Sequence, residues 1–234
     1  MAEDSGGGQR RRSAGDQTLA MTLPCGITYR LGRTLYVALT NSCNAVSLIQ
    51  SRGPGFAMPV QSGFAPLPEG FTPSAEEVYQ AVEAAQGDYD SIAFAGAGEP
   101  LLRLGVLEQA AQLLLPKGVP LRVNTNGLVA RSEAPVLAQR LRAAGLSSVS
   151  VALASADADQ YAALMRPEKL RYSPVFSLTL GLSDVTGFVE ACVAAGLAVE
   201  CTAVAAPEVD LQAAEALAKA LGAGFRSRAY FAAT

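Results

Sequence analysis

Three short segments carry the residue types best suited to hold a small molecule. They read Thr-Asn-Ser-Cys-Asn at 40–44, Gly-Ala-Gly-Glu-Pro at 96–100 and Asn-Thr-Asn-Gly at 124–127. Together they supply a thiol, a carboxylate, several amides and glycine turns whose backbone a ligand can approach closely. Gly-Glu-Pro and Asn-Gly are also ordinary turn sequences, so each segment taken alone predicts only a turn. Their chemistry depends on whether the fold brings them together.

The chain contains no histidine among its 234 residues. This excludes Ser-His-Asp and Cys-His nucleophilic machinery, imidazole general-base catalysis and every metal site with a histidine ligand. The cysteines are Cys25, Cys43, Cys192 and Cys201, and they form neither a CxxC pair nor an obvious disulfide framework. We therefore expect a reducing compartment, the cytoplasm.

The composition is that of one globular, soluble domain. Half of the residues are hydrophobic and the formal net charge is −3. The one basic run, Arg10 to Arg12, lies in a segment rich in Gly, Ser and Asp, so we expect a disordered leader over 1–26 and a folded domain over 27–234. Clustered Lys and Arg are otherwise missing, which argues against nucleic-acid binding. No apolar run is long enough to predict a membrane span.

Strand and helix signals alternate along the folded part. This alternation predicts right-handed βαβ units, a parallel sheet and an α/β fold, namely a partial (β/α)6 TIM-like barrel, with an open sheet of flavodoxin type as the rival. Both folds bind ligands at the carboxyl ends of the strands, where the three segments lie. The stretch between 155 and 183 is predicted to be irregular. The predicted strands are 27–30, 34–40, 91–96, 121–126, 148–154, 199–205 and 225–231, and the predicted helices are 74–86, 104–115, 133–144, 184–195 and 211–221.

The two faces of each strand differ in side-chain size. In the strand 148–154, Val149, Val151 and Leu153 share one face, while small residues such as Ser150 and Ala152 share the other. We expect the large residues to face the helices and the small ones to face inward. Such an interior has room for a ligand, or else it is closely packed with small residues; the pattern leaves both open.

In their order and spacing, these segments resemble a family. Together with Val-Ala-Leu-Ala-Ser-Ala-Asp-Ala at 151–158, they resemble the radical SAM superfamily, most of all its compact subgroup associated with TatD-type metal-dependent hydrolases. The resemblance runs from 27 to 231. It implies a six-stranded partial barrel in which a Cys-x3-Cys-x2-Cys motif holds a 4Fe–4S cluster and the cluster binds S-adenosylmethionine. It further implies that Gly98 and Glu99 contact the methionine amino group, and that Asn124 and Asn126 face the ribose or the substrate. The implied cofactor-binding residues are Gly96, Gly98, Glu99, Pro100, Asn124, Thr125 and Asn126.

The cysteine motif of that family is degenerate here. Its spacing falls on Cys43, Ser47 and Gln50, so only Cys43 is a thiol. Iron–sulfur clusters are held by thiolates, and a serine hydroxyl or a glutamine amide is no comparable ligand. None of Cys25, Cys192 and Cys201 lies close enough to Cys43 in the sequence for a single loop to enclose a cluster. Ala154 and Ile49 also depart from the family, which often has an asparagine and an aromatic residue there.

We therefore predict a radical SAM-like protein without the standard 4Fe–4S cluster, acting as a non-catalytic or ligand-binding homologue. S-adenosylmethionine or a related small molecule at the strand ends is the expected ligand. One alternative is an active radical SAM enzyme whose non-standard cluster uses Cys43 as a metal ligand. Another is a histidine-free enzyme that uses Glu99 with Asp157 or Asp159 as an acid–base pair. The sequence identifies neither the substrate nor a protein partner.

Overall fold

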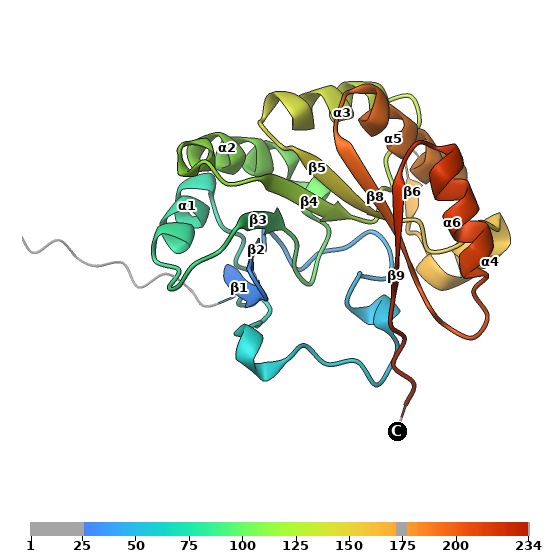
Figure 1. Cartoon of the computed structure of the whole chain (residues 1–234), viewed down its shortest axis with the longest axis horizontal. Coiled ribbons are helices and arrows are strands. Elements are labelled where there is room, and N and C mark those ends of the chain that lie inside the picture. Colours follow the sequence, from blue (N-terminus) through green and yellow to red (C-terminus); the bar gives the residue numbers. More distant parts are fainter. Residues whose placement is uncertain (1–25, 172–176, 234) are drawn as a thin grey trace, which may run out of the picture.

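Six parallel strands follow one another across one sheet in chain order. The computed structural model describes residues 26–171 and 177–233, and the sheet order is β1-β2-β3-β4-β5-β8-β9 (Figure 1). An antiparallel hairpin joins β1 to β2, and every later pairing in this sheet is parallel. The strands are β1 (Thr28–Leu31), β2 (Thr34–Val37), β3 (Ser91–Phe94), β4 (Leu121–Thr125), β5 (Ser148–Ala152), β8 (Ala198–Val204) and β9 (Gly224–Arg228).

This order confirms the partial barrel. A flavodoxin-type sheet does not keep its strands in chain order, whereas this one does, so the rival fold is wrong. β1 and β9 stand at opposite ends of the order, which leaves the barrel open. The leader predicted for 1–26 falls almost wholly on residues 1–25, which lie outside the described residues.

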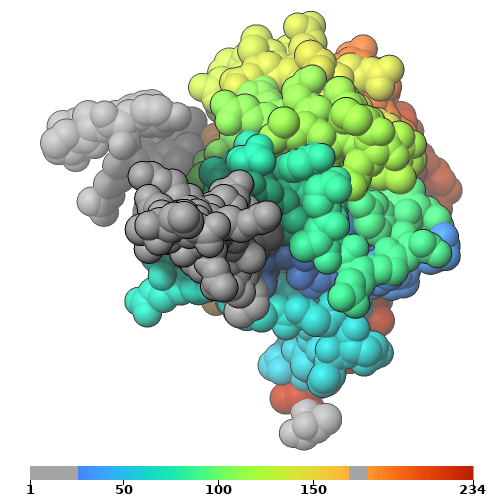
Figure 2. Space-filling model, turned by 90° about the vertical axis from the view of Figure 1, so that its left-hand side faces the viewer, coloured from blue at the N-terminus to red at the C-terminus, as the bar shows by residue number. Residues whose placement is uncertain are grey.

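The helices that connect the parallel strands cover the outer face of the curved sheet (Figure 1). Figure 2 shows α1, α2 and α3, in teal to yellow-green, forming one continuous surface. Short 3-10 helices interrupt the loops at Gln50–Arg52 (η1), Val60–Ser62 (η2), Pro100–Arg103 (η3) and Leu115–Lys117 (η4). The connecting helices are α1 (Ala75–Glu83), α2 (Leu104–Leu114), α3 (Ala134–Ala143), α5 (Leu182–Ala194) and α6 (Leu211–Ala220).

The stretch between 155 and 183 is more regular than its sequence predicts. It contains α4 (Ala158–Met165) and an antiparallel pair formed by β6 (Lys169–Arg171) and β7 (Ser177–Thr179). The Asp157 side chain begins α4 by accepting a hydrogen bond from the backbone N–H of Gln160 at 2.7 Å. The helix is only eight residues long, so its apolar periodicity is too short to stand out in the sequence.

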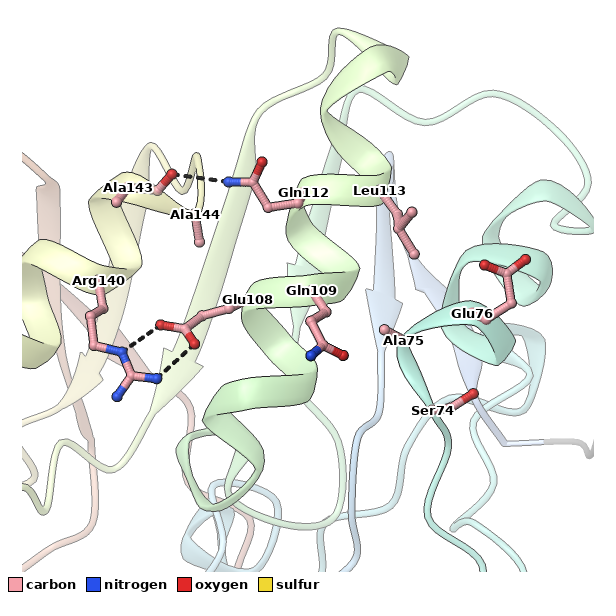
Figure 3. A pocket seen from close by; sticks show the side chains of 10 residues that line it. All are labelled: Ser74, Ala75, Glu76, Glu108, Gln109, Gln112, Leu113, Arg140, Ala143 and Ala144. Carbon is pink, nitrogen blue, oxygen red and sulfur yellow. Dashed lines mark hydrogen bonds and ion pairs between the residues drawn. The ribbon is translucent and has the colours of Figure 1, made fainter.

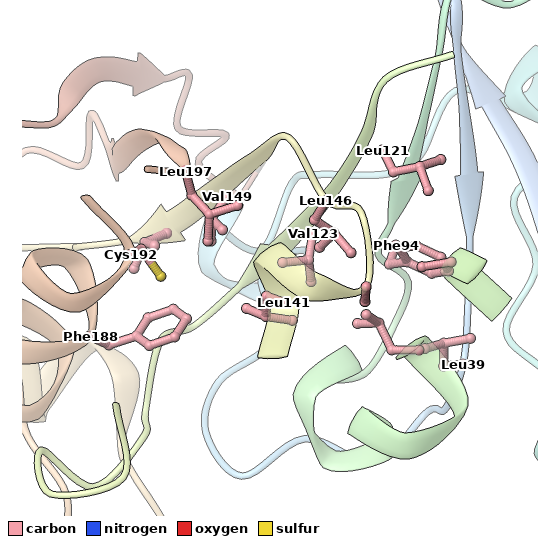
Figure 4. Close-up of a cluster of buried hydrophobic side chains, with 14 of the residues drawn as sticks. Leu39, Phe94, Leu121, Val123, Leu141, Leu146, Val149, Phe188, Cys192 and Leu197 are labelled. Carbon is pink, nitrogen blue, oxygen red and sulfur yellow. The ribbon is translucent and has the colours of Figure 1, made fainter. Parts of the chain in front are cut away.

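The main core lies between the sheet and the outer helices. Val149 of β5 packs in a buried cluster with Leu141 of α3 and Phe188 of α5 (Figure 4). The alternate residues Ala152 and Thr202 instead line a space on the opposite side of the sheet, next to α4. The predicted division of the strand faces is therefore confirmed, and the interior does hold space.

Candidate functional site

The loop that follows β2 is held in place from several sides. We call residues 40–56 the first loop. Its Asn41 amide exchanges two hydrogen bonds with the backbone of Leu67, at 2.8 and 3.1 Å. The Val46 N–H donates to the Met165 carbonyl at 2.7 Å, and the Asn44 carbonyl accepts from Glu168 at 2.8 Å. Protein contacts therefore shape this loop over most of its length.

Ser47 and Gln50, which stand at two cluster-ligand positions of the family, are bonded to each other. The Gln50 N–H donates to the Ser47 hydroxyl at 3.2 Å, and the Ser47 N–H donates to the Gln50 side-chain oxygen at 3.2 Å. This reciprocal Ser-x-x-Gln arrangement has the hydrogen-bond pattern of a capping box and overlaps the start of the short helix η1, whose own N-cap residue, Ile49, makes no side-chain bond. Both side chains therefore already accept hydrogen bonds from the local backbone.

Cys43 is half-buried at the start of the same loop. Burial raises the pKa of its thiol, and the nearby Glu99 acts in the same direction. Hydrogen bonds from the Ala45 backbone and the Asn126 side chain act in the opposite direction. The Asn126 amide nitrogen lies 3.8 Å from the Cys43 sulfur.

The remaining cysteines do not complete a cluster site. Cys192 of α5 and Cys201 of β8 are fully buried in the core on the helix side of the sheet (Figure 4 labels Cys192). Burial raises the pKa of each thiol to about 12. Cys25 lies outside the described residues. Within the described ranges, no three Cys, Asp or Glu side chains come together as a metal site. The thiol, hydroxyl and amide donors at 43, 47 and 50 therefore do not fit an iron–sulfur cluster.

Glu99 joins the ends of β3 and β4. Its carboxylate accepts hydrogen bonds from the Thr125 hydroxyl at 2.7 Å, the Asn126 N–H at 2.8 Å and the Leu101 N–H at 3.0 Å. Its side chain is 3% exposed. Burial raises the pKa of Glu99, although all three hydrogen bonds oppose that shift. Three of the carboxylate's four lone-pair positions are thus taken by the protein, and the free one is on Oε2, so a ligand ammonium would have a single acceptor position here.

Asn126 continues this bonded unit. Its amide donates to the Asn44 side chain at 2.7 Å and accepts from the Leu128 N–H at 2.9 Å. The structure therefore brings together Glu99, Thr125 and Asn126, as the sequence predicted, but their polar groups face one another. Pro100 begins the 3-10 helix that follows Glu99.

Gly98 allows the first loop to approach the end of β3. A Cβ atom at this position would lie 2.4 Å from the Ser42 carbonyl oxygen and 2.6 Å from that of Thr40. The Glu99 N–H also donates to the Ser42 carbonyl at 2.9 Å. No larger residue fits here unless the loop moves, so packing alone already requires the glycine.

Asn124 faces the opposite way, into the barrel. It lines a cavity of about 80 Å³, the inner cavity, together with Gly96 and Gly98. Its Oδ1 is buried and has no hydrogen-bond partner among the described residues. The inner cavity is also lined by Tyr29, Tyr36, Arg52 and Arg228.

Sequence analysis did not single out these last four side chains. Strand alternation places Arg228 two residues after Arg226, and Asn124 two after Arg122, so both pairs point to one face. That alternation is the signal that could have found Arg228; Arg52 lies in a loop, where no strand pattern applies.

The acid–base pair predicted between Glu99 and Asp157 or Asp159 is not formed. Glu99 is enclosed by its three donors, whereas Asp157 caps α4 and Asp159 is exposed on that helix. No hydrogen bond among the described residues joins these carboxylates. The structure lends no support to carboxylate catalysis at this place.

Another depression lies on the helical side, away from the strand ends. It is a shallow groove of about 810 Å³ across α1, α2 and α3 (Figure 3). Glu108 of α2 and Arg140 of α3 form an ion pair in it at 2.7 Å, and Gln112 donates to the Ala143 carbonyl at 3.0 Å (Figure 3). Its polar side chains largely satisfy one another, so we place the candidate site in the inner cavity instead.

No helix in the described part of the chain combines the length and the apolar character needed to cross a membrane.

Comparisons with known proteins agree with this fold. The family model of the radical SAM superfamily matches residues 60–221. No curated relative matches the chain by sequence. Crystal structures of Streptococcus suis SuiB, bound to precursor peptide SuiA or to S-adenosylmethionine, each align with a TM-score of 0.59. Their identities are 11% and 12%, and each alignment covers 86% of this chain but 40% of SuiB.

A further structural neighbour is the radical S-adenosylmethionine methyltransferase TsrM from Kitasatospora setae, with cobalamin and a 4Fe–4S cluster bound. It has a TM-score of 0.50 and 15% identity, and the alignment covers 82% of this chain and 34% of TsrM. At such identities the likeness shows the fold alone. The chain spans less than half the length of either enzyme.

Proposed function

Because the chain belongs to the radical SAM superfamily, we propose that it is a cluster-free member of the family that binds a small molecule inside the half-barrel. We assign it to the compact TatD-associated subgroup because the segments 40–44, 96–100, 124–127 and 151–158 occur in that subgroup's order and spacing. The function proposed is ligand binding without radical chemistry.

The observation that carries this proposal is the capping box between Ser47 and Gln50. Two of the three ligand positions hold side chains bonded to each other's backbone N–H groups at 3.2 Å. Releasing them toward a metal would leave both N–H groups without these acceptors, and neither side chain offers a thiolate in return.

The S-adenosylmethionine part of the prediction finds less support than the ligand-binding part. In this chain the Glu99 carboxylate, expected to meet the methionine amino group, is occupied by Thr125, Asn126 and Leu101. The inner cavity keeps Gly96, Gly98 and Asn124 on its wall. The unpartnered Asn124 Oδ1 on this wall supports a small-molecule site whose ligand does not need the Glu99 carboxylate.

The test is anaerobic reconstitution with iron and sulfide, followed by quantification of both and by visible absorption spectroscopy. We expect the natural chain to retain no stoichiometric cluster. The matched variant S47C/Q50C rebuilds the family triad, and we expect it to take up iron and sulfide, with the uptake lost again in C43A/S47C/Q50C. A stoichiometric 4Fe–4S cluster in the natural chain, abolished by C43A, would refute the proposal and favour the active enzyme with a non-standard cluster.

A further inference from the structure

Arginine side chains converge on the interior of the half-barrel. Arg228 of β9 and Arg52 of the first loop both line the inner cavity. Arg122 of β4 donates to the Tyr36 hydroxyl at 3.1 Å, and Tyr36 lines the same cavity. Two guanidinium groups from separate segments therefore line one small space, and a third is bonded to a tyrosine on its wall.

No carboxylate among the described residues lines the inner cavity, and Glu208 lies on the wall of the adjoining cavity that Arg228 also borders. Glu200 is the acidic residue nearest in the sheet, and it is paired with Arg226 at 2.5 Å. Arg228, in contrast, has no side-chain hydrogen bond or ion pair with any residue in the described ranges. Burial lowers the pKa of Arg228, and the neighbouring Arg226 and Arg52 lower it further. Grouped, half-buried positive charges of this kind are costly unless an anion accompanies them.

Arg52 is held so that its outer nitrogens remain available. Its Nε donates to the Ala229 carbonyl at 2.8 Å, and its guanidinium lies 4.7 Å from the Phe56 ring centroid and 5.4 Å from that of Phe231. The first loop is tied to the C-terminal segment nearby, because Phe231 donates to the Arg52 carbonyl at 2.8 Å (the two segments lie side by side in Figure 1). This guanidinium is oriented before any ligand arrives.

Asn124 adds a neutral amide to the same wall. It is 6% exposed, and its Oδ1 has no partner in the described part of the chain. Buried polar atoms are normally hydrogen-bonded, so an unpartnered one beside a cavity indicates a missing partner. A hydroxyl on a ligand, such as that of a hydrogen phosphate, would donate to this oxygen.

We propose that the inner cavity binds a compact oxyanion, the phosphate or carboxylate group of a small molecule, between Arg52, Arg228 and Asn124. Guanidinium groups bind both anions through charge-assisted, often bidentate hydrogen bonds. A volume of about 80 Å³ admits one such group rather than a nucleotide. S-adenosylmethionine carries an ammonium and a sulfonium against one carboxylate, so its net positive charge is repelled here. This inference specifies the ligand class of the function proposed above.

Titration calorimetry on the full chain at fixed ionic strength tests it, with inorganic phosphate, malonate and S-adenosylmethionine as separate probes. We expect phosphate or malonate to bind, and S-adenosylmethionine to bind at least tenfold more weakly than the better of the two. R228Q should weaken anion binding at least tenfold, because it removes a charged hydrogen-bond donor. The control R142Q removes the same charge from the exposed face of α3 and should leave the affinity within twofold.

N124D provides a second variant of nearly unchanged shape. The new carboxylate would neutralise Arg228 in place of the ligand, so anion binding should be lost while circular dichroism shows the fold retained. The proposal is overturned if neither anion binds the natural chain, or if R228Q and N124D bind as tightly as the natural chain does. Iron and sulfide are measured on the same samples. A cluster in the natural chain would refute the cluster-free function and leave the anion result to be judged separately.

Discussion

Replacing Glu99 with alanine tests whether this buried carboxylate holds the ends of β3 and β4 together. The substitution removes the acceptor of three hydrogen bonds, from Thr125, Asn126 and Leu101. Hydrogen bonds to a charged group contribute about 1.5–3 kcal/mol each, and a buried donor left unpaired costs about 1–3 kcal/mol. The loss is partly offset because the protein no longer buries a carboxylate whose pKa burial has raised. We therefore expect E99A to lose about 3 kcal/mol of unfolding free energy.

The isosteric variant E99Q separates charge from shape. Its amide oxygen can still accept from Thr125 and Leu101, but its NH₂ group faces the Asn126 N–H, so we expect a loss of about 1–2 kcal/mol. The exposed Glu69 offers a matched control, and E69A should change stability by less than about 0.5 kcal/mol.

Urea denaturation at pH 7, followed by circular dichroism, measures all three variants. With a slope of about 3 kcal/mol per molar urea, the E99A midpoint should fall by about 1 M. A loss below about 1 kcal/mol in E99A, or equal losses in E99A and E99Q, would show that the three hydrogen bonds do not brace these strand ends.

Three further predictions concern the first loop, the backbone and the buried thiols. S47A should cost about 1 kcal/mol and speed amide exchange at Gln50, because it removes the hydroxyl acceptor of the capping box; unchanged exchange would count against the box. A154N should raise the unfolding free energy by about 0.5–1 kcal/mol, measured by urea denaturation, because Ala154 has a φ of 60° and asparagine tolerates this left-handed conformation better; a destabilised variant would contradict this. In the folded protein the pKa of Cys192 and of Cys201 is about 12, which exceeds the value of an unfolded thiol, about 8.5. The contribution of these buried neutral thiols to the free energy of unfolding is therefore complete below about pH 8.5 and is lost as the pH rises toward 12. Stability should therefore fall by up to about 1.4 kcal/mol per pH unit for each thiol, and C201A should show a shallower slope than the natural chain.

The order of the strands and helices followed from the sequence alone. Strand signals alternate with amphipathic helices, which predicts right-handed βαβ units and a parallel sheet. The choice between a progressively wound half-barrel and a doubly wound sheet was made by the strand order in the structure. The alternation of Val149, Val151 and Leu153 with small residues also predicted which face the helices cover. These signals are local, because they depend on side-chain periodicity within a few residues. These signals did not predict helix α4, since its eight residues include only one turn of buried contacts and resemble a loop.

The candidate site followed partly from the sequence and partly from the tertiary structure. Motif order placed Glu99, Asn124 and Asn126 at neighbouring strand ends, and the missing thiols at 47 and 50 were visible in the sequence. Which donors Glu99 meets was decided by the adjacent strand, which turned the carboxylate toward Thr125 and the Asn126 N–H. The residue pattern along one strand does not show which side chains and backbone groups the neighbouring strand presents to it.

The charge inside the barrel was decided by tertiary structure alone. Arg52 and Arg228 lie at opposite ends of the folded chain, and only the curvature of the open sheet brings them to one cavity. Glu200 forms its ion pair with Arg226, and no ion pair to Arg228 occurs among the described residues, although both arginines stand on the same strand face. Sequence determined that this chain keeps the scaffold of its family without the thiolates of a cluster. Long-range packing determined that two arginines line one cavity inside that scaffold, because the surroundings of a charge are set by neighbours in space rather than in sequence.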